Sequence, residues 1–172
     1  YGEVAAVARE EGQTGLDSLE LELGRPVQSM LAQAGTAAEA LDAWDEAAAE
    51  IKFDGARVQI HVREGDDEDG ELGEISIYSR NMDDVTAALP DIVSDVRRSV
   101  TEPCILDGEV VAVDEDGDPL PFQHVLQRFR RKHDIEQMVE EETLRLHAFD
   151  CLRAGSDRDR KSTRLNSSDV CS

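Results

Sequence analysis

Long apolar runs and closely spaced cysteines are absent from this sequence. No stretch approaches the roughly 20 apolar residues of a membrane span, and the first residues do not resemble a signal peptide, so we expect neither a membrane protein nor a secreted one. The three cysteines, Cys104, Cys151 and Cys171, form no C-x-x-C pair and give no indication of a zinc site. An odd number of cysteines without a targeting signal is typical of reduced thiols, which predicts a cytoplasmic protein.

Cationic residues are also scarce. The chain has 18 Lys and Arg against 39 Asp and Glu, a net charge of −21, and its lysines are Lys52, Lys132 and Lys161. Such a charge repels polyphosphate partners in ordinary salt. At molar salt the Debye length falls to about 3 Å, and the repulsion is screened. The acidity therefore favours a halophile over an acidic mesophile and leaves nucleic acid open as a partner.

The 172 residues are enough for one ordinary domain, and a hydrophobic content of 40% excludes a disordered tail. Residues 1–23 are acidic and amphipathic, start without Met, and are expected to be the end of an upstream domain and its linker. Residues 24–152 carry the periodic patterns of the domain. Residues 153–172 have no apolar periodicity, and we expect them to be a sequence artefact, with a natural disordered tail as the alternative.

Hydrophobic periodicity within 24–152 alternates between helix and strand. Thr36 and Glu39 form a capping box that predicts a helix to about Ala47, with Trp44 in the core. The period changes to two from Ala49. Strands are expected over 49–54, 57–62, 74–80, 104–113 and 144–151. Helices are expected over 83–99, with an interruption near Pro90, and over 122–132 and 134–142. Short hairpin connections between the early strands predict an α+β (mixed α/β) fold with antiparallel sheets flanked by helices.

The segment 50–57, E-I-K-F-D-G-A-R, is the most informative one. Strand alternation places Lys52 between Glu50 and Asp54 on one face. A lysine acts as a nucleophile only when its amine is neutral, which burial or nearby cations promote. Arg57 could supply positive charge and bind a phosphate. The alternative is a surface lysine paired with its neighbouring acids.

Two further groups of residues point to a site. Asp107 and Glu109 lie on one strand face within an apolar run, where carboxylates need a cation, a metal or donor hydrogens. The alternative is a hairpin turn at Asp107–Gly108. The cluster 78–81, Y-S-R-N, ends a strand with donors suited to phosphate or sugar oxygens. The basic run 128–132 could contact a DNA backbone or form a solvated helix face.

In this order and spacing these motifs resemble the archaeal ATP-dependent DNA ligases. The resemblance also covers R-P-V-Q-S-M-L-A near residue 25, L-P-F-Q-H-V-L-Q-R-F-R-R-K over 120–132 and L-H-A-F-D-C-L over 146–152. It implies a nucleotidyltransferase fold, with 24–152 as part of the adenylation domain and 1–23 as the end of an N-terminal DNA-binding domain. The family's downstream Glu-Gly and Lys-x-Lys motifs and its OB-fold domain are not in this sequence, so we expect a C-terminally truncated fragment that cannot ligate DNA alone.

The resemblance also implies roles for residues and partners. Lys52 would attack ATP to form lysyl-AMP, which is then passed to nicked duplex DNA, with Mg²⁺ or Mn²⁺ as the metal. Expected partners are the nicked DNA and a sliding clamp, and the protein is expected to be a monomer. By position in the family pattern, the nucleotide-binding residues would be Glu50 beside the adenine, Arg57 and Arg80 at the ribose or phosphates, Glu109 at the ribose or metal, and Phe149 stacked on the base, with Asp54 and Asp107 in support.

Two alternatives remain open at this point. An RNA ligase or a GTP-using capping enzyme would share the lysine motif. A non-catalytic acidic module that binds nucleotide or protein would leave Lys52, Arg80 and Glu109 unexplained.

Overall fold

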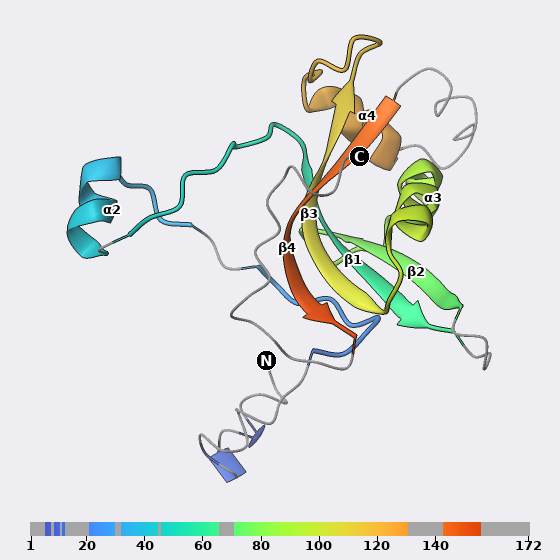
Figure 1. The fold of residues 1–172 in the computed structure, drawn as a ribbon, viewed down its shortest axis with the longest axis horizontal. Coiled ribbons are helices and arrows are strands. Elements are labelled where there is room, and N and C mark those ends of the chain that lie inside the picture. The colour runs from blue at the N-terminus through green and yellow to red at the C-terminus, as the bar shows by residue number, and fades with distance from the viewer. Residues whose placement is uncertain are drawn as a thin grey trace.

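The computed structural model describes residues 6–7, 9–10, 12, 21–29, 32–44, 46–65, 71–130 and 143–155. Its centre is a four-stranded sheet in the order β2–β1–β3–β4, with every neighbouring pair antiparallel (Figure 1). The strands are β1 (Ala56–Glu64), β2 (Leu72–Ser79), β3 (Cys104–Val113) and β4 (Thr143–Ala154). The helical elements are α2 (Ala37–Ala43), the 3-10 helix η1 (Thr86–Ala88), α3 (Pro90–Ser99) and α4 (Gln123–Arg130). The predicted mixed α/β class with antiparallel pairing is confirmed.

One face of the sheet carries the hydrophobic core. Alternate residues of β1, among them Val58, Ile60 and Val62, are buried there because side chains alternate across a strand. Ile92 and Val96 of the amphipathic α3 pack into the same cluster, as do residues of η1 and α4. Figure 1 shows α3 lying along the sheet, whereas α2 stands apart from it. Helices η1, α3 and α4 pack on this face, and the opposite face carries a group of polar side chains from β1 and β3.

The opposite face, which we call the polar face, bears Arg57, Gln59 and His61 of β1 together with Asp107 and Glu109 of β3. Several of these groups are buried despite their polarity: Gln59 is 6% exposed, His61 0% and Asp107 5%. Buried polar groups need hydrogen-bond partners, and those partners define the site described below.

Most of the predicted elements are confirmed. β3 has the predicted bounds, and β4 extends the predicted strand at both ends. β2 is displaced, because it begins at Leu72 and ends at Ser79, before the predicted end at 80. β1 and β2 form the expected hairpin, with Glu64 opposite Leu72, although its tip at 66–70 lies outside the described residues. The predicted helical stretch 83–99 divides at Pro90, which takes the first turn of α3, where its missing N–H costs nothing.

The segment before β1 differs from the prediction. Residues 46–53 form no strand, so Glu50, Lys52 and Asp54 do not share a strand face. The alternation was too short to define a strand without a partner to pair with. The capping box at Thr36 is present, but α2 ends at Ala43 rather than near Ala47. Trp44 is 65% exposed, so its predicted place in the core is wrong.

The basic run at the end of α4 also differs in part. Arg128 is fully buried and its Nη2 donates to Asp91 Oδ2 of α3 at 2.5 Å, so it is available neither to DNA nor to solvent. Phe129 packs against the core. The predicted helix 134–142, and most of 1–23 and 153–172, lie outside the described residues. No helix within the described part of the chain is long and apolar enough to cross a membrane.

Candidate functional site

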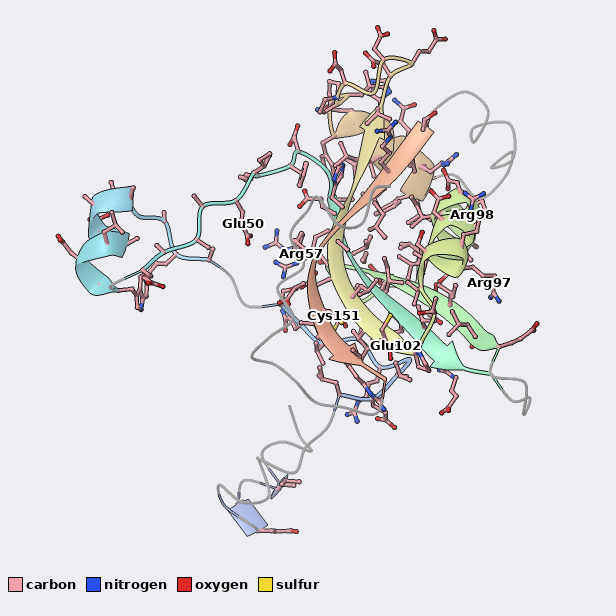
Figure 2. The ribbon with its side chains drawn as sticks, in the orientation of Figure 1. Glu50, Arg57, Arg97, Arg98, Glu102 and Cys151 are labelled. Carbon is pink, nitrogen blue, oxygen red and sulfur yellow. The ribbon has the colours of Figure 1, made fainter. Side chains whose placement is uncertain are left out.

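Lys52 lies three residues before the glycine at which the chain joins the sheet. Its side chain is exposed, as are those of Glu50 and Asp54. Figure 2 shows Glu50 on the connection between α2 and the sheet, with Arg57 at the sheet itself. The position of the lysine therefore depends on how the chain is held at residues 53–55.

Two contacts hold this segment against the sheet. The Gly55 N–H donates to Glu109 Oε1 of β3 at 2.9 Å. The Phe53 ring stacks on His147 of β4, with centroids 4.1 Å apart and planes 20° from parallel. Burial of the His147 ring lowers its pKa, with Arg145 adding to the effect, so the stacked imidazole is neutral at neutral pH. The residues on either side of Asp54 are thus fixed to two different strands.

Glycine is required at position 55 by the closeness of β3. A Cβ atom at Gly55 would lie 2.3 Å from the Val110 carbonyl oxygen and 2.9 Å from a Val111 methyl group. No side chain fits there unless the backbone of β3 or of the segment before β1 moves. The glycine of the lysine motif is therefore needed for a close approach of two chains.

Arg57 and Asp107 form a bidentate ion pair on the polar face. Arg57 Nε donates to Asp107 Oδ1 at 3.0 Å, and Nη2 donates to Oδ2 at 2.6 Å. The hydrogen bonds to Asp107 raise the pKa of Arg57 against the opposing effect of burial. The Arg57 side chain is 37% exposed, so N–H donors remain for a ligand. Asp107 is thereby a supporting residue, and the alternative of a hairpin turn at Asp107–Gly108 is wrong because both lie within β3.

A β-bulge places Phe149 beside this pair. Asp107 is opposite Asp150 and Gly108 is opposite Ala148, so Phe149 is an extra residue in β4. The Arg57 guanidinium carbon lies 5.5 Å from the centre of its ring, a cation–π distance. Bulges are common next to active sites, where they redirect a side chain.

The structure therefore brings together most of the predicted site residues. Arg57 contacts both Asp107 and Phe149. Glu109 holds the lysine segment through Gly55. A small depression is lined by Arg57, Arg80 and Asp107. Glu50 and Asp54 are exposed and take part in none of these contacts. The sequence motifs assign no role to Phe53 or His147, so the stack between their rings is not among the predicted contacts. The aromatic residue at position 53, next to the lysine, was the sequence feature that could have indicated this stack.

Glu109 is the predicted metal ligand. Its Oε1 accepts the Gly55 N–H, and its side chain is partly exposed, so its other oxygen can reach a ligand. No group of three or more His, Cys, Asp or Glu that could hold a metal occurs among the described residues.

The sequence model of the family described as "ATP dependent DNA ligase domain" matches residues 29–165, most of the chain. The chain belongs to this ligase family. The Haloferax volcanii DNA ligase is 60% identical over 157 residues, which cover 91% of this chain and 26% of that protein. For the Halorubrum lacusprofundi DNA ligase the identity is 63%, and the match covers 91% of this chain and 27% of the relative.

A more distant relative is the Archaeoglobus fulgidus DNA ligase, with 51% identity over 88% of this chain and 26% of its own length. This ligase chain thus spans about a quarter of the length of its curated relatives. Among solved structures, the ligase domain of M. tuberculosis LigD matches with a TM-score of 0.45 and 24% identity, over 63% of this chain and 30% of that one. A mycobacterial DNA ligase D complexed with ATP and MES matches with a TM-score of 0.40 and 25% identity. The haloarchaeal source of these relatives supports the prediction, made from the net charge, of a halophilic origin.

Proposed function

We propose that this chain supplies the nucleophile and part of the nucleotide site of an ATP-dependent DNA ligase. Lys52 is the nucleophile, and residues 24–152 belong to the adenylation domain. The observation that carries the proposal is the attachment of the lysine motif, through the Gly55 N–H and Glu109 Oε1, to the polar face that bears the Arg57–Asp107 pair. A nucleotide bound at that face would lie next to the lysine segment.

The reaction proceeds by three displacements at phosphorus. The Lys52 amine attacks the α-phosphorus of ATP, so a P–N bond forms with loss of a proton from the nitrogen, the bond to the β-phosphate oxygen breaks and pyrophosphate leaves. A 5′-phosphate oxygen at a DNA nick then attacks the same phosphorus and the P–N bond breaks. Finally, the 3′-hydroxyl attacks the 5′-phosphorus, which forms the phosphodiester and releases AMP. Such transfers depend mainly on positioning and charge stabilisation.

Each site residue has a part in this scheme. Arg57 and Arg80 would bind ribose or phosphate oxygens, Phe149 would stack on the adenine and Glu50 would lie beside it. Glu109 would contact the ribose or hold Mg²⁺, which supplies positive charge for the developing phosphate charge. Asp107 orients Arg57 through two hydrogen bonds, and Asp54 has a supporting place in the lysine motif.

The wider setting is proposed on the same basis. Nicked duplex DNA is the substrate, a sliding clamp is a candidate partner, and the ligase acts as a monomer. DNA as the substrate implies a cytoplasmic location in an archaeal cell. Residues 1–23 would be the end of a DNA-binding domain, and the tail predicted for 153–172 would begin only after β4, which ends at Ala154.

The first test measures label transfer to Lys52. Because this chain spans about a quarter of its relatives, the assay uses an exchange ligase, which is the Haloferax volcanii ligase with its matching segment replaced by residues 21–155 of this chain. With ATP labelled at the α-phosphate, we expect covalent label on the exchange ligase, none with Lys52→Arg, and none on the 172-residue chain alone.

The controls separate the alternatives. Unlabelled GTP should not compete for the label, and nicked duplex DNA should discharge it, whereas a nick in duplex RNA should not. A Lys52→Arg exchange ligase that still becomes labelled would refute the assignment of the nucleophile. Stoichiometric AMP on the isolated chain would overturn the expectation that this segment alone is inactive.

A further inference from the structure

Residues 21–29, which we call the entrance segment, cross the polar face beside the candidate site. The Gly24 N–H donates to His61 Nδ1 at 2.9 Å, and the Val27 N–H donates to Gln59 Oε1 at 2.9 Å. Gln59 Nε2 in turn donates to the Val27 carbonyl oxygen at 3.3 Å. The Gln59 amide therefore pairs with both backbone groups of Val27, as a neighbouring strand would.

The two side chains that hold the segment also hold each other. His61 Nε2 lies 3.0 Å from Gln59 Oε1. Because Nδ1 accepts the Gly24 N–H, the proton of the neutral ring is on Nε2, and Nε2 donates to Gln59. Gln59 and His61 are 6% and 0% exposed, so these bonds are formed away from water. A buried network in which each group is satisfied fixes one arrangement of the chain.

Further hydrogen bonds extend this attachment to both edges of the sheet. The Tyr78 hydroxyl of β2 donates to the Gly24 carbonyl oxygen at 3.0 Å. Arg153 of β4 donates through Nη1 to the Leu21 carbonyl oxygen at 2.9 Å. Strands β2 and β4 are the two outer strands of the sheet. The entrance segment is thus attached at several points across the full width of the sheet.

The end of the entrance segment borders directly on the candidate nucleotide residues. A depression of about 10 Å³, the space of about one water molecule, separates them. It is lined from the entrance segment by Pro26, Val27 and Ser29 and from the sheet by Arg57, Arg80 and Asp107. With so little space between them, a shift of the segment changes the surroundings of both arginines.

We propose that Gln59 and His61 are positioning residues for the nucleotide, because they hold residues 26–29 as a fixed wall beside Arg57 and Arg80. This inference rests on the proposed function. The side chains touch the entrance segment and not the nucleotide. Their loss therefore weakens ATP binding and leaves the displacement at phosphorus itself unchanged.

The test measures label transfer from ATP in the exchange ligase, with Gln59→Leu as the first variant. Leucine has a similar volume but cannot pair with Val27. We expect the KM for ATP to rise about tenfold, with kcat for lysyl-AMP formation within about twofold of the parent. Gln123→Leu, at an exposed position of α4, is the matched control and should change neither constant.

A second variant covers the case in which Gln59→Leu fails to fold. Tyr78→Phe removes only the hydroxyl that bonds Gly24 and leaves the partly exposed ring in place. We expect a smaller rise in KM, about threefold, again without loss of kcat. If either folded variant keeps the parental KM, or loses kcat instead, the positioning role is refuted.

Hydrogen exchange on the isolated chain separates this inference from the proposed function. The Gly24 and Val27 amides should be protected in the parent and should exchange at least tenfold faster in Gln59→Leu, while the amides of β1 and β3 keep their protection. Equal protection in both chains refutes the attachment whatever the enzyme does. Absence of label on the unsubstituted exchange ligase, with the amide result as expected, refutes the proposed function and not the attachment.

Discussion

At the scale of single residues, the site depends on a backbone approach that only glycine permits. Gly55 donates its N–H to Glu109, and the position of its missing side chain is filled by β3. Gly55 therefore donates the hydrogen bond to Glu109 and, because it has no side chain, also leaves the space in which β3 comes close enough to accept it. A hydrogen bond of this kind contributes about 1 kcal/mol, whereas forcing a methyl group into the strand backbone costs about 1–3 kcal/mol.

Gly55→Ala should destabilise the chain and displace the lysine. A Cβ at 2.3 Å from the Val110 oxygen must move either β3 or the segment before β1. We expect a loss of about 2 kcal/mol in the free energy of unfolding, measured by urea titration, and at least tenfold slower lysyl-AMP formation in the exchange ligase.

Gly35→Ala is the matched control for this prediction. A Cβ at Gly35 would come no closer than 3.5 Å to Glu39 Oε2, an ordinary contact. Its unfolding free energy should stay within about 0.5 kcal/mol of the parent. Equal unfolding free energies of the Gly55→Ala and Gly35→Ala chains would contradict the prediction, because they would show that β3 can move to accommodate the methyl group without loss of stability.

At the scale of elements, the attachment of the entrance segment to the sheet should depend on pH. Burial lowers the pKa of His61 from 6.5 to about 4, with Arg63 adding to the effect. Above pH 6.5 the ring is neutral in both states, and its contribution to stability is fully present. As the pH falls from 6.5 towards 4, the unfolded chain takes up a proton and the folded chain does not, so stability is lost over this range.

His61→Asn tests this pH dependence. Its side-chain oxygen can accept the Gly24 N–H but does not titrate. Between pH 7 and pH 5 the parent should lose about 2 kcal/mol of unfolding free energy relative to His61→Asn, because the other titrating groups are common to both chains. Urea midpoints at the two pH values measure the difference. A constant gap between the two chains would show that His61 does not titrate as a buried neutral ring.

The elements that sequence patterns predicted are those set by local periodicity. A continuous apolar run gave β3 its bounds, and the capping box at Thr36 located the start of α2. The bulge at Phe149 was not predictable, because an extra residue breaks the period on which strand prediction rests. Strict alternation puts Cys151 on the same face as His147, whereas the bulge turns Cys151 to face the core beside Leu106.

The sequence predicted which residues make up the candidate site, but not the ion pair and the hydrogen bonds that hold them in place. The sequence predicted Lys52, Arg57 and Asp107 as site residues, but the pairing of Arg57 with Asp107 joins residues 50 positions apart. The bond from Val27 to Gln59 likewise spans 32 positions. Such contacts are set by the register of β1 against β3 and by the path of residues 21–29, which leave no local signal. The exposed, irregular chain around Lys52 was misread as a strand for the same reason.

At the scale of the whole molecule, the net charge of −21 should set the conditions under which the sheet is stable. Most of the Asp and Glu side chains among the described residues are exposed, and their mutual repulsion disfavours the compact state. In 0.1 M salt this repulsion acts over about 10 Å, and at 1 M over about 3 Å. The haloarchaeal relatives are consistent with a chain adapted to high salt, at which the repulsion is screened.

Raising potassium chloride from 0.1 to 3 M should therefore increase Tm by roughly 10 °C, equivalent to about 3–4 kcal/mol in a chain of this size. Salt also strengthens apolar burial, so the test needs a variant that alters charge alone. Replacing the exposed Glu71, Glu102 and Glu115 by Gln removes three charges far from the ion pair of Arg57 and Asp107. If repulsion is the cause, this variant is more stable than the parent at 0.1 M salt and the two converge at 3 M. An unchanged salt dependence would instead attribute the effect to the burial of apolar surface.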